Sequence, residues 1–225
     1  MEEQRGDNMP RDTARLTLRP FEKRDFGPLA ELVATTWLRD FPGRPGELAS
    51  TVELCDYLSQ TTWSLVAEQN GTLLGAILLH EKDREVAEER LWRRRGLEAE
   101  RAAAVSSEAA LAVGTEMAGV IEGSALAREY ALTGTPEASR SLKLLIVSPN
   151  ARGLGLGKLL FDKMRSYLRE CGAAGYFLLT DDACDVGFYE HMGLVRAVER
   201  KSGVPWPGVD PSTDDFHIYV YSERL

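Results

Sequence analysis

Hydrophobic and polar positions at the start of the chain predict one strand followed by two helices. Residues 15–19 alternate between polar and apolar side chains, which is typical of a strand. Apolar residues then recur every three to four positions between Asp25 and Trp37, and again over 47–58. We therefore expect two helices that each bury one face.

A β-hairpin is predicted next. Two apolar runs, 63–68 and 73–79, are joined through Asn70-Gly71, the residue pair that most favours a tight hairpin turn. Gly75 within the second run indicates a bulge or a close approach of another backbone.

The segment 81–140 has a helical composition instead of a strand pattern. It is rich in Ala, Glu and Arg, which favour helices, and it is divided by Gly96, Gly114, Gly119 and Gly123. We expect two or three short helices here. Because weak helices are stable only when packed, the segment must lie on another part of the molecule.

A strand, a glycine-rich turn and a helix follow in that order. Residues 142–147 are an apolar run, glycines then alternate at 153, 155 and 157, and apolar residues recur at helical spacing over 156–168. Further strands are predicted at 176–180, 194–200 and 216–221. The first of these should run parallel to 142–147, because a helix crosses between them.

The glycine-rich turn has the composition of an anion site. The first amides of a helix have no partner within it, and glycines allow the backbone to approach phosphate oxygens closely. Arg152 and Lys158 add positive charge at the two edges of the turn. A P-loop is excluded because Arg152 and Leu159 stand where it needs Gly and Ser or Thr. A dinucleotide fingerprint is excluded because Lys158 replaces its third glycine.

Arg152-Gly153-Leu154-Gly155-Leu156-Gly157 resembles the acetyl-CoA loop of the GNAT superfamily of N-acyltransferases, whose motif is Gln/Arg-x-x-Gly-x-Gly/Ala. The resemblance implies an α+β fold, a twisted mixed sheet flanked by helices. It implies one domain over 14–225, with a helical insertion at about 82–140. Acetyl-CoA would be the co-substrate, with its pyrophosphate on the loop amides and its pantetheine arm along the strand at 142–147. The alternative is a glycine turn that only joins a strand to a helix.

A second stretch, 180–194, resembles the GNAT segment that ends in Phe/Leu-Tyr-Glu-x-x-Gly-Phe. The residues that the two stretches imply for co-substrate binding are Leu145, Ile146, Val147, Arg152, Gly153, Leu154, Gly155, Leu156, Gly157, Lys158, Asp182, Cys184 and Phe188. Asp182 stands where many members have a pantetheine-binding asparagine.

Two residues of this second stretch are candidates for catalysis. The resemblance implies that Tyr189 protonates the departing thiolate of coenzyme A, which a phenol of pKa near ~10 can do. The alternative is a packed aromatic residue beside Phe188. Asp181, at the end of the preceding strand, is our candidate to accept the proton of the attacking amine. Transfer in this superfamily is usually direct, and Cys184 has no histidine at the spacing of a nucleophile and base.

Composition narrows the class of protein. The 225 residues carry a net charge of −8, which argues against a general nucleic-acid binder. The three cysteines have no CxxC spacing and lie in apolar patterns, so we expect reduced core residues. Residues 1–13 are expected to be a disordered leader, too polar for a signal peptide, and no apolar run has the length of a membrane span. We expect a soluble cytoplasmic protein without a metal.

The function predicted from the sequence is acetyl transfer from acetyl-CoA to an amine of a small molecule or peptide. The alternative is a non-catalytic acyl-CoA-binding module on the same fold. For the insertion we hypothesise a lid or wall over the acceptor site, with Trp92, Met117 and Tyr130 as candidate contacts. An ornamental insertion or an oligomer interface, such as that of a homodimer, is equally compatible with its composition.

Overall fold

The computed structural model describes residues 16–206 and 215–225. The predicted leader at 1–13 lies outside these residues, as does part of the loop between the last two strands. Within the described residues, seven strands form one mixed sheet in the order β1-β2-β3-β4-β5-β7-β6. The strands are β1 (Thr17–Arg19), β2 (Trp63–Gln69), β3 (Thr72–Glu81), β4 (Arg140–Val147), β5 (Gly175–Asp181), β6 (Val195–Lys201) and β7 (His217–Arg224).

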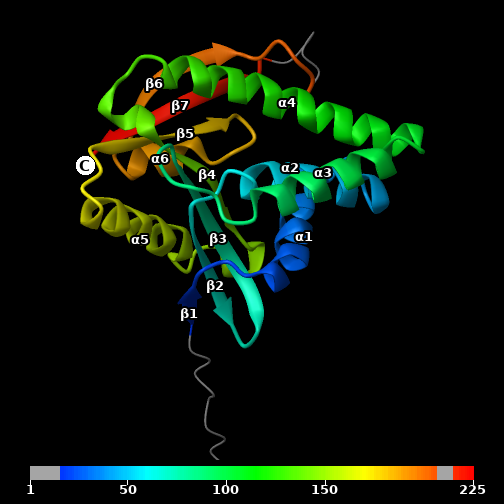
Figure 1. Ribbon diagram of the computed structural model, residues 1–225, viewed down its shortest axis with the longest axis horizontal. Coiled ribbons are helices and arrows are strands. Elements are labelled where there is room, and N and C mark those ends of the chain that lie inside the picture. The colour runs from blue at the N-terminus through cyan, green and yellow to red at the C-terminus, as the bar shows by residue number, and fades with distance from the viewer. Residues whose placement is uncertain (1–15, 207–214) are drawn as a thin grey trace, which may run out of the picture.

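Helices lie on both faces of this sheet (Figure 1). The α-helices are α1 (Phe26–Trp37), α2 (Arg44–Leu58), α3 (Glu89–Ala103), α4 (Ser107–Ala131), α5 (Leu156–Glu170) and α6 (Val186–His191). Short 3₁₀ turns are η1 (Lys23–Asp25), η2 (Pro136–Ser139) and η3 (Pro149–Ala151). The α+β architecture, with a mixed sheet flanked by helices, is therefore confirmed.

The hydrophobic core is divided between the two faces of the sheet. On one face, Phe161 and Met164 of α5 are fully buried with Tyr176 of β5. On the other face, α1 and α2 pack over β2, β3 and β4. The same face is covered further along by α4, whose Leu126 packs with Ile218 of β7. The helix pair α1 and α2 and the long helix α4 thus flank the middle of one face.

The parallel pair β4 and β5 separates at this point. Ser141 lies opposite Phe177 and Leu142 opposite Leu178, and the pairing stops there within the described residues. On the other edge of β4, Leu142 and Leu144 pair with consecutive residues of β3, so Lys143 is the extra residue of a β-bulge. Because a bulge bends its strand, it helps to explain why β4 leaves β5.

The hairpin between β2 and β3 has the predicted turn. Asn70 and Gly71 both have positive φ, 53° and 77°, as a two-residue turn of type I′ requires. Gly75 marks a close approach, because a Cβ there would lie 2.8 Å from the carbonyl oxygen of Ile146 on β4. The glycine therefore allows β3 and β4 to pair tightly next to the glycine loop.

The insertion forms two helices, and its glycines do not divide the second one. α4 is a continuous helix of 25 residues that contains Gly114, Gly119 and Gly123. Two of these glycines lie at packing contacts: a Cβ at Gly119 would lie 3.0 Å from the ring of Trp206, and one at Gly123 would lie 2.5 Å from Leu179. The expectation of short helices was wrong here because close packing offsets the low helix propensity of glycine.

Among the described residues, α4 alone is long and apolar enough to cross a membrane by length and composition. A core helix of a soluble protein passes the same test. The first half of α4 packs on α2 and α3, and its second half packs on β5 and β7. These contacts explain its apolar composition.

Three details of the structure differ from what local periodicity suggests. The side chain of Asp25 does not cap α1, because its carboxylate binds the guanidinium of Arg19. Cys171 is exposed at the end of α5. Tyr219 and Tyr221 of β7, although they carry polar hydroxyl groups, are buried beneath α5 and α6. Each difference depends on tertiary contacts that local periodicity does not contain.

Candidate active site

The glycine loop joins β4 to α5 through two residues of left-handed backbone conformation. Gly153 and Gly155 have φ of 75° and 71°, which favours glycine. A Cβ at either position would meet no atom within 4 Å, so the loop backbone faces open space. Among the described residues no side chain caps the start of α5. The loop therefore offers unpaired amides and the positive end of the helix dipole to an anion.

A groove of about 810 Å³ adjoins this loop. It brings together most of the residues that the sequence predicted for co-substrate binding, namely Leu145, Ile146, Val147, Arg152, Gly153, Gly155, Leu156, Gly157, Lys158, Cys184 and Phe188. The volume lies within the range of ligand sites in proteins. Because Leu145–Val147 belong to the part of β4 that has separated from β5, an extended ligand can pair with this edge as an added strand.

A second, smaller cavity of about 130 Å³ adjoins the groove. It is bounded by α2 and α4 and by the separated ends of β4 and β5. The residues common to both cavities are Trp37, Leu145, Ala183, Cys184 and Tyr189. Two molecules bound in the two cavities would therefore meet beside the same short wall.

Tyr189 lies in this wall, on the helix α6. Asp185 caps that helix by accepting a hydrogen bond of 3.1 Å from the amide of Phe188. The ring of Tyr189 packs with Phe188 and Tyr221, with centroids 5.4 and 6.0 Å apart. Burial raises the pKa of Tyr189 well above its usual value, and the negative charge of nearby Asp181 adds to the effect. The phenol is therefore neutral at physiological pH and can donate a proton.

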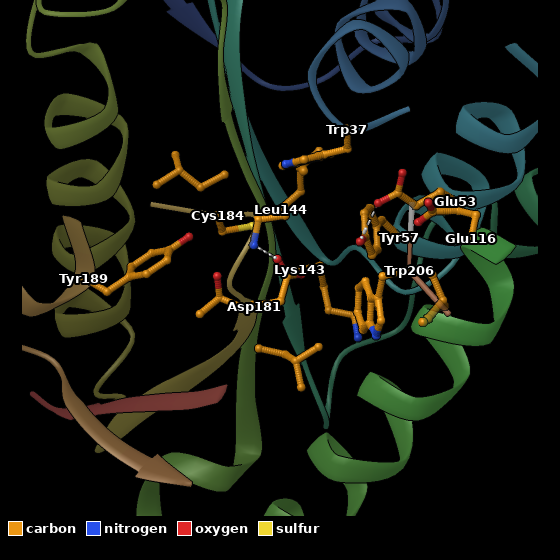
Figure 2. Close-up of a pocket in the computed structure, with 16 residues that line it drawn as sticks. Trp37, Glu53, Tyr57, Glu116, Lys143, Leu144, Asp181, Cys184, Tyr189 and Trp206 are labelled. Carbon is orange, nitrogen blue, oxygen red and sulfur yellow. Dashed lines mark hydrogen bonds between the residues drawn. The ribbon is translucent and has the colours of Figure 1, made fainter. Parts of the chain in front are cut away.

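Cys184 lies in the same wall, and Asp181 lies near it on the side of the smaller cavity (Figure 2). The Asp181 carboxylate accepts a hydrogen bond of 2.9 Å from the amide of Ala183, and it lines the smaller cavity. Burial raises the pKa of Asp181, which makes it a stronger base than an exposed aspartate. Burial also raises the pKa of the Cys184 thiol, and the charge of Asp181 raises it further. Cys184 is therefore held as a neutral thiol.

Two predicted binding residues do not line the groove. Asp182 points toward the neighbouring strand β7, where its carboxylate accepts hydrogen bonds from the amide of His217, at 2.7 Å, and the hydroxyl of Tyr219, at 2.6 Å. Asp182 thus holds β5 to β7, because its partners lie on that strand. The Leu154 side chain is 77% exposed at the tip of the loop, so only its backbone remains available to a ligand.

The insertion contributes Glu116, Gly119 and Val120 of α4 to the smaller cavity. The three residues named as candidate contacts lie elsewhere. Trp92 stacks on Phe26 in the core, Met117 packs between α2, α3 and α4, and Tyr130 packs on Phe177.

Sequence reasoning missed Glu53 and Glu116, which are only 4% and 7% exposed. One signal was available for Glu116. Glu116 follows Ala112 by four positions and Val113 by three, so helical spacing places it on the same buried face of α4. Glu53 lies next to the buried Val52 and Leu54 in α2. No His/Cys/Asp/Glu group in the described part of the chain has the arrangement of a metal site.

A mixed sheet with two diverging parallel strands, a glycine loop opening a helix, and a groove between them defines the acyl-CoA N-acyltransferase fold. The family model of the acetyltransferase (GNAT) domain matches residues 97–203, from within α3 to the residues just after β6. By this match, residues 97–203 belong to the GNAT acetyltransferase domain family.

Solved structures share this fold at low sequence identity. The ribosomal-protein-S18-alanine N-acetyltransferase from Escherichia coli is 14% identical, with 94% of each chain covered and a TM-score of 0.53. Ard1 from Thermoplasma volcanium is 16% identical, with 93% of this chain and 97% of that chain covered and a TM-score of 0.52. The smu.2055 protein from Streptococcus mutans UA159 is 12% identical, with 92% of this chain and 98% of that chain covered and a TM-score of 0.55. No curated protein matches the chain.

Proposed function

We propose that this protein is a cytoplasmic N-acetyltransferase that transfers the acetyl group of acetyl-CoA to an amine by direct attack in a ternary complex. The observation that carries the proposal is the wall shared by the two cavities. Cys184 and Tyr189 line both the groove at the glycine loop and the smaller cavity. A carrier in the groove and an acceptor in the cavity can therefore be bound at the same time, with their reacting groups at this wall.

The groove suits acetyl-CoA at two points. The open amides at Gly153 and Gly155 and the charges of Arg152 and Lys158 match the diphosphate of coenzyme A. The free edge of β4 at Leu145–Val147 offers backbone groups to the amides of the pantetheine arm. Both features lie on one continuous groove, so one extended ligand can use both.

The chemistry requires two proton transfers. The amine nitrogen forms a bond to the thioester carbonyl carbon while its own proton passes to Asp181, directly or through water. The C–S bond then breaks, and the departing thiolate takes the hydroxyl proton of Tyr189. Burial keeps this phenol protonated until then, because its pKa is raised. An acyl-enzyme on Cys184 is disfavoured, since the raised pKa of the thiol leaves almost no thiolate to attack.

Binding and turnover test the proposal in turn. Titration calorimetry should detect binding of acetyl-CoA, and a thiol-release assay over a panel of amines should detect turnover. Lys158→Ala, at the loop, should weaken acetyl-CoA binding by about 10-fold because it removes one phosphate-directed charge. Lys163→Ala is the matched control, because Lys163 is an exposed lysine on the same helix that does not line the groove.

The outcomes separate the two candidate functions. Binding of acetyl-CoA without release of thiol for any amine would favour the non-catalytic acyl-CoA-binding module. Absence of acetyl-CoA binding, or equal affinity in the Lys158→Ala and Lys163→Ala variants, would contradict the assignment of the groove.

A further inference from the structure

The smaller cavity contains three carboxylates from three different elements. Glu53 comes from α2, Glu116 from α4 and Asp181 from the end of β5. Figure 2 shows Glu53 and Glu116 together on one side of the cavity and Asp181 with Tyr189 on the other. Two of the three acids are thus away from the reacting wall, where the catalytic proposal has no role for them.

The side chains of this cavity have unused hydrogen-bonding capacity. Glu53 is 4% exposed, and its Oε1 accepts a hydrogen bond of 2.8 Å from the hydroxyl of Tyr57. Its Oε2 is buried and has no partner in the described structure. Buried polar atoms without partners are rare, because their desolvation is costly, and they indicate a missing ligand or water.

The nearby cation does not neutralise this pair of glutamates. Lys143, at the bulge of β4, lines the same cavity, but its opposing charge is Asp56 of α2. Within the described residues Glu53 and Glu116 form no ion pair with any lysine, arginine or histidine. The site therefore lacks a positive charge that buried carboxylates normally require.

We propose that the acceptor is a small diamine or polyamine end, whose second ammonium group is held by Glu53 and Glu116 while its reacting amine lies beside Asp181 and Tyr189. This inference rests on the proposed acetyl transfer and specifies its substrate class. A monoamine whose only nitrogen lies at the reacting wall would leave the two glutamates without a counter-charge.

The walls of the cavity fit an alkyl chain that ends in a cation. The aromatic rings of Trp37, Tyr57 and Trp206 line it, and such rings attract ammonium groups through their faces. Leu144 and Leu179 add apolar surface for methylene groups. The volume of about 130 Å³ is close to that of a protein cavity that holds one benzene molecule, roughly 150 Å³. The cavity therefore has room for a short diamine.

Protonation of the glutamates supports the same assignment. Burial raises the pKa of Glu53, and the charge of Glu116 raises it further. Burial and the charge of Asp181 raise the pKa of Glu116 to about 7. The groups that face this pair are Tyr57 and Asp56 on α2, Lys143 on β4 and Asp181 on β5. An ammonium group lowers carboxyl pKa values, so its binding should release protons near neutral pH.

Calorimetry with diaminobutane and its matched monoamine, butylamine, tests the inference without turnover. Diaminobutane should bind the wild-type protein about 30-fold more tightly, as expected for a buried charge pair. Titrations at pH 7 in two buffers of different ionisation enthalpy should show release of protons. Glu53→Gln and Glu116→Gln should each weaken diaminobutane binding and lower the preference to within a few-fold of unity. Glu108→Gln is the control, because Glu108 is exposed on α4 and lies outside the cavity.

Kinetic constants and circular dichroism separate loss of diamine recognition from loss of folding. In the thiol-release assay the diamine should have the lower KM, and Glu53→Gln should raise that KM with little change in kcat. Circular dichroism checks that each variant folds, and Glu116→Gln provides an independent test from a different helix. Equal binding of diaminobutane and butylamine, or a preference that survives in both glutamine variants, would overturn the inference. Failure of the proposed function is a different result, namely no thiol release with any amine.

Discussion

At the scale of single residues, burial decides which groups at the site are charged. Tyr189 and Cys184 are held neutral because the surrounding side chains remove water from them. The same burial acts on Asp181 and Glu116 and raises the pKa of both carboxyls. The site thus pairs a neutral acid with an unusually basic carboxylate, as proton transfer in both directions requires.

Tyr189→Phe should lower kcat for amine acetylation by about 100-fold or more, because the thiolate then leaves without a proton donor. The affinity for acetyl-CoA should change little, since the ring and its packing remain. Tyr221→Phe is the matched control. Tyr221 packs beside Tyr189 but lines neither cavity, and its hydroxyl is bound to Glu190 at 2.9 Å. The rate of thiol release at saturating substrate measures kcat. A kcat in Tyr189→Phe equal to that of the wild type would rule out the acid role of Tyr189.

Glu116 gives a prediction for stability against pH. Its folded-state pKa is raised to about 7, whereas the carboxyl in the unfolded chain titrates near its usual value of 4.5. Between these values the folded state binds more protons, so stability falls as pH rises from about 4.5 to 7 and is then level. The ionised form of the buried Glu116 is costly because the carboxyls of Glu53 and Asp181 face it.

Glu116→Gln removes this penalty. The variant should gain up to about 3 kcal/mol in the free energy of unfolding at pH 8 and almost nothing at pH 4.5. Urea denaturation at the two pH values measures the difference, and Glu108→Gln should show no comparable pH dependence. A gain that is the same at both pH values would contradict the assigned pKa.

At the scale of elements, the site depends on the junction between β4 and α5. The loop needs two residues with left-handed backbone conformation. The first turn of α5 has no side-chain cap within the described structure. The same helix ends at Gly172, which also has a left-handed conformation, with φ of 66°. The two ends of α5 therefore have similar backbone requirements, but only the first adjoins the groove.

Gly155→Ala and Gly172→Ala separate binding from backbone strain. At both positions a Cβ would meet no atom within 4 Å and φ is left-handed, so each variant should lose about 1–2 kcal/mol of stability. Only Gly155→Ala places its methyl group in the groove, so only this variant should bind acetyl-CoA more weakly, by about 10-fold. Calorimetry and urea denaturation measure the two effects. Equal losses of affinity in both variants would show that strain alone is responsible.

At the scale of the whole molecule, the two cavities lie where the sheet divides and the helices leave one face partly open. The groove adjoins α5 and α6, and the smaller cavity adjoins α2 and α4. A molecule can therefore bind in one cavity while the other cavity is occupied. This arrangement favours a reaction in which both substrates are present together.

Steady-state kinetics provide the check. Double-reciprocal plots of rate against amine concentration, at several fixed concentrations of acetyl-CoA, should intersect, because both substrates bind before either product leaves. Parallel lines would indicate an acyl-enzyme and would contradict direct transfer. Cys184→Ala is a further control. It should retain turnover, because the proposed direct transfer gives the thiol no covalent role.

Much of the groove proposed for the co-substrate could be predicted from the sequence because its parts are local. The strand 142–147, the glycines at 153 and 155 and the start of α5 lie within a short stretch, so their periodicity and turn chemistry determine the junction directly. The hairpin at Asn70-Gly71 is local in the same sense. The helical character of 81–140 also follows from its composition.

Only the tertiary structure decided which side chains line the smaller cavity. Glu53, Glu116 and Asp181 come from separate elements, and they meet because α4 packs beside α2 over the point where β4 leaves β5. Tertiary packing likewise turned Asp182 toward β7 and kept α4 continuous through its glycines. Contacts between such distant residues depend on how faces pack against one another, and the spacing of residues along the chain does not record that choice.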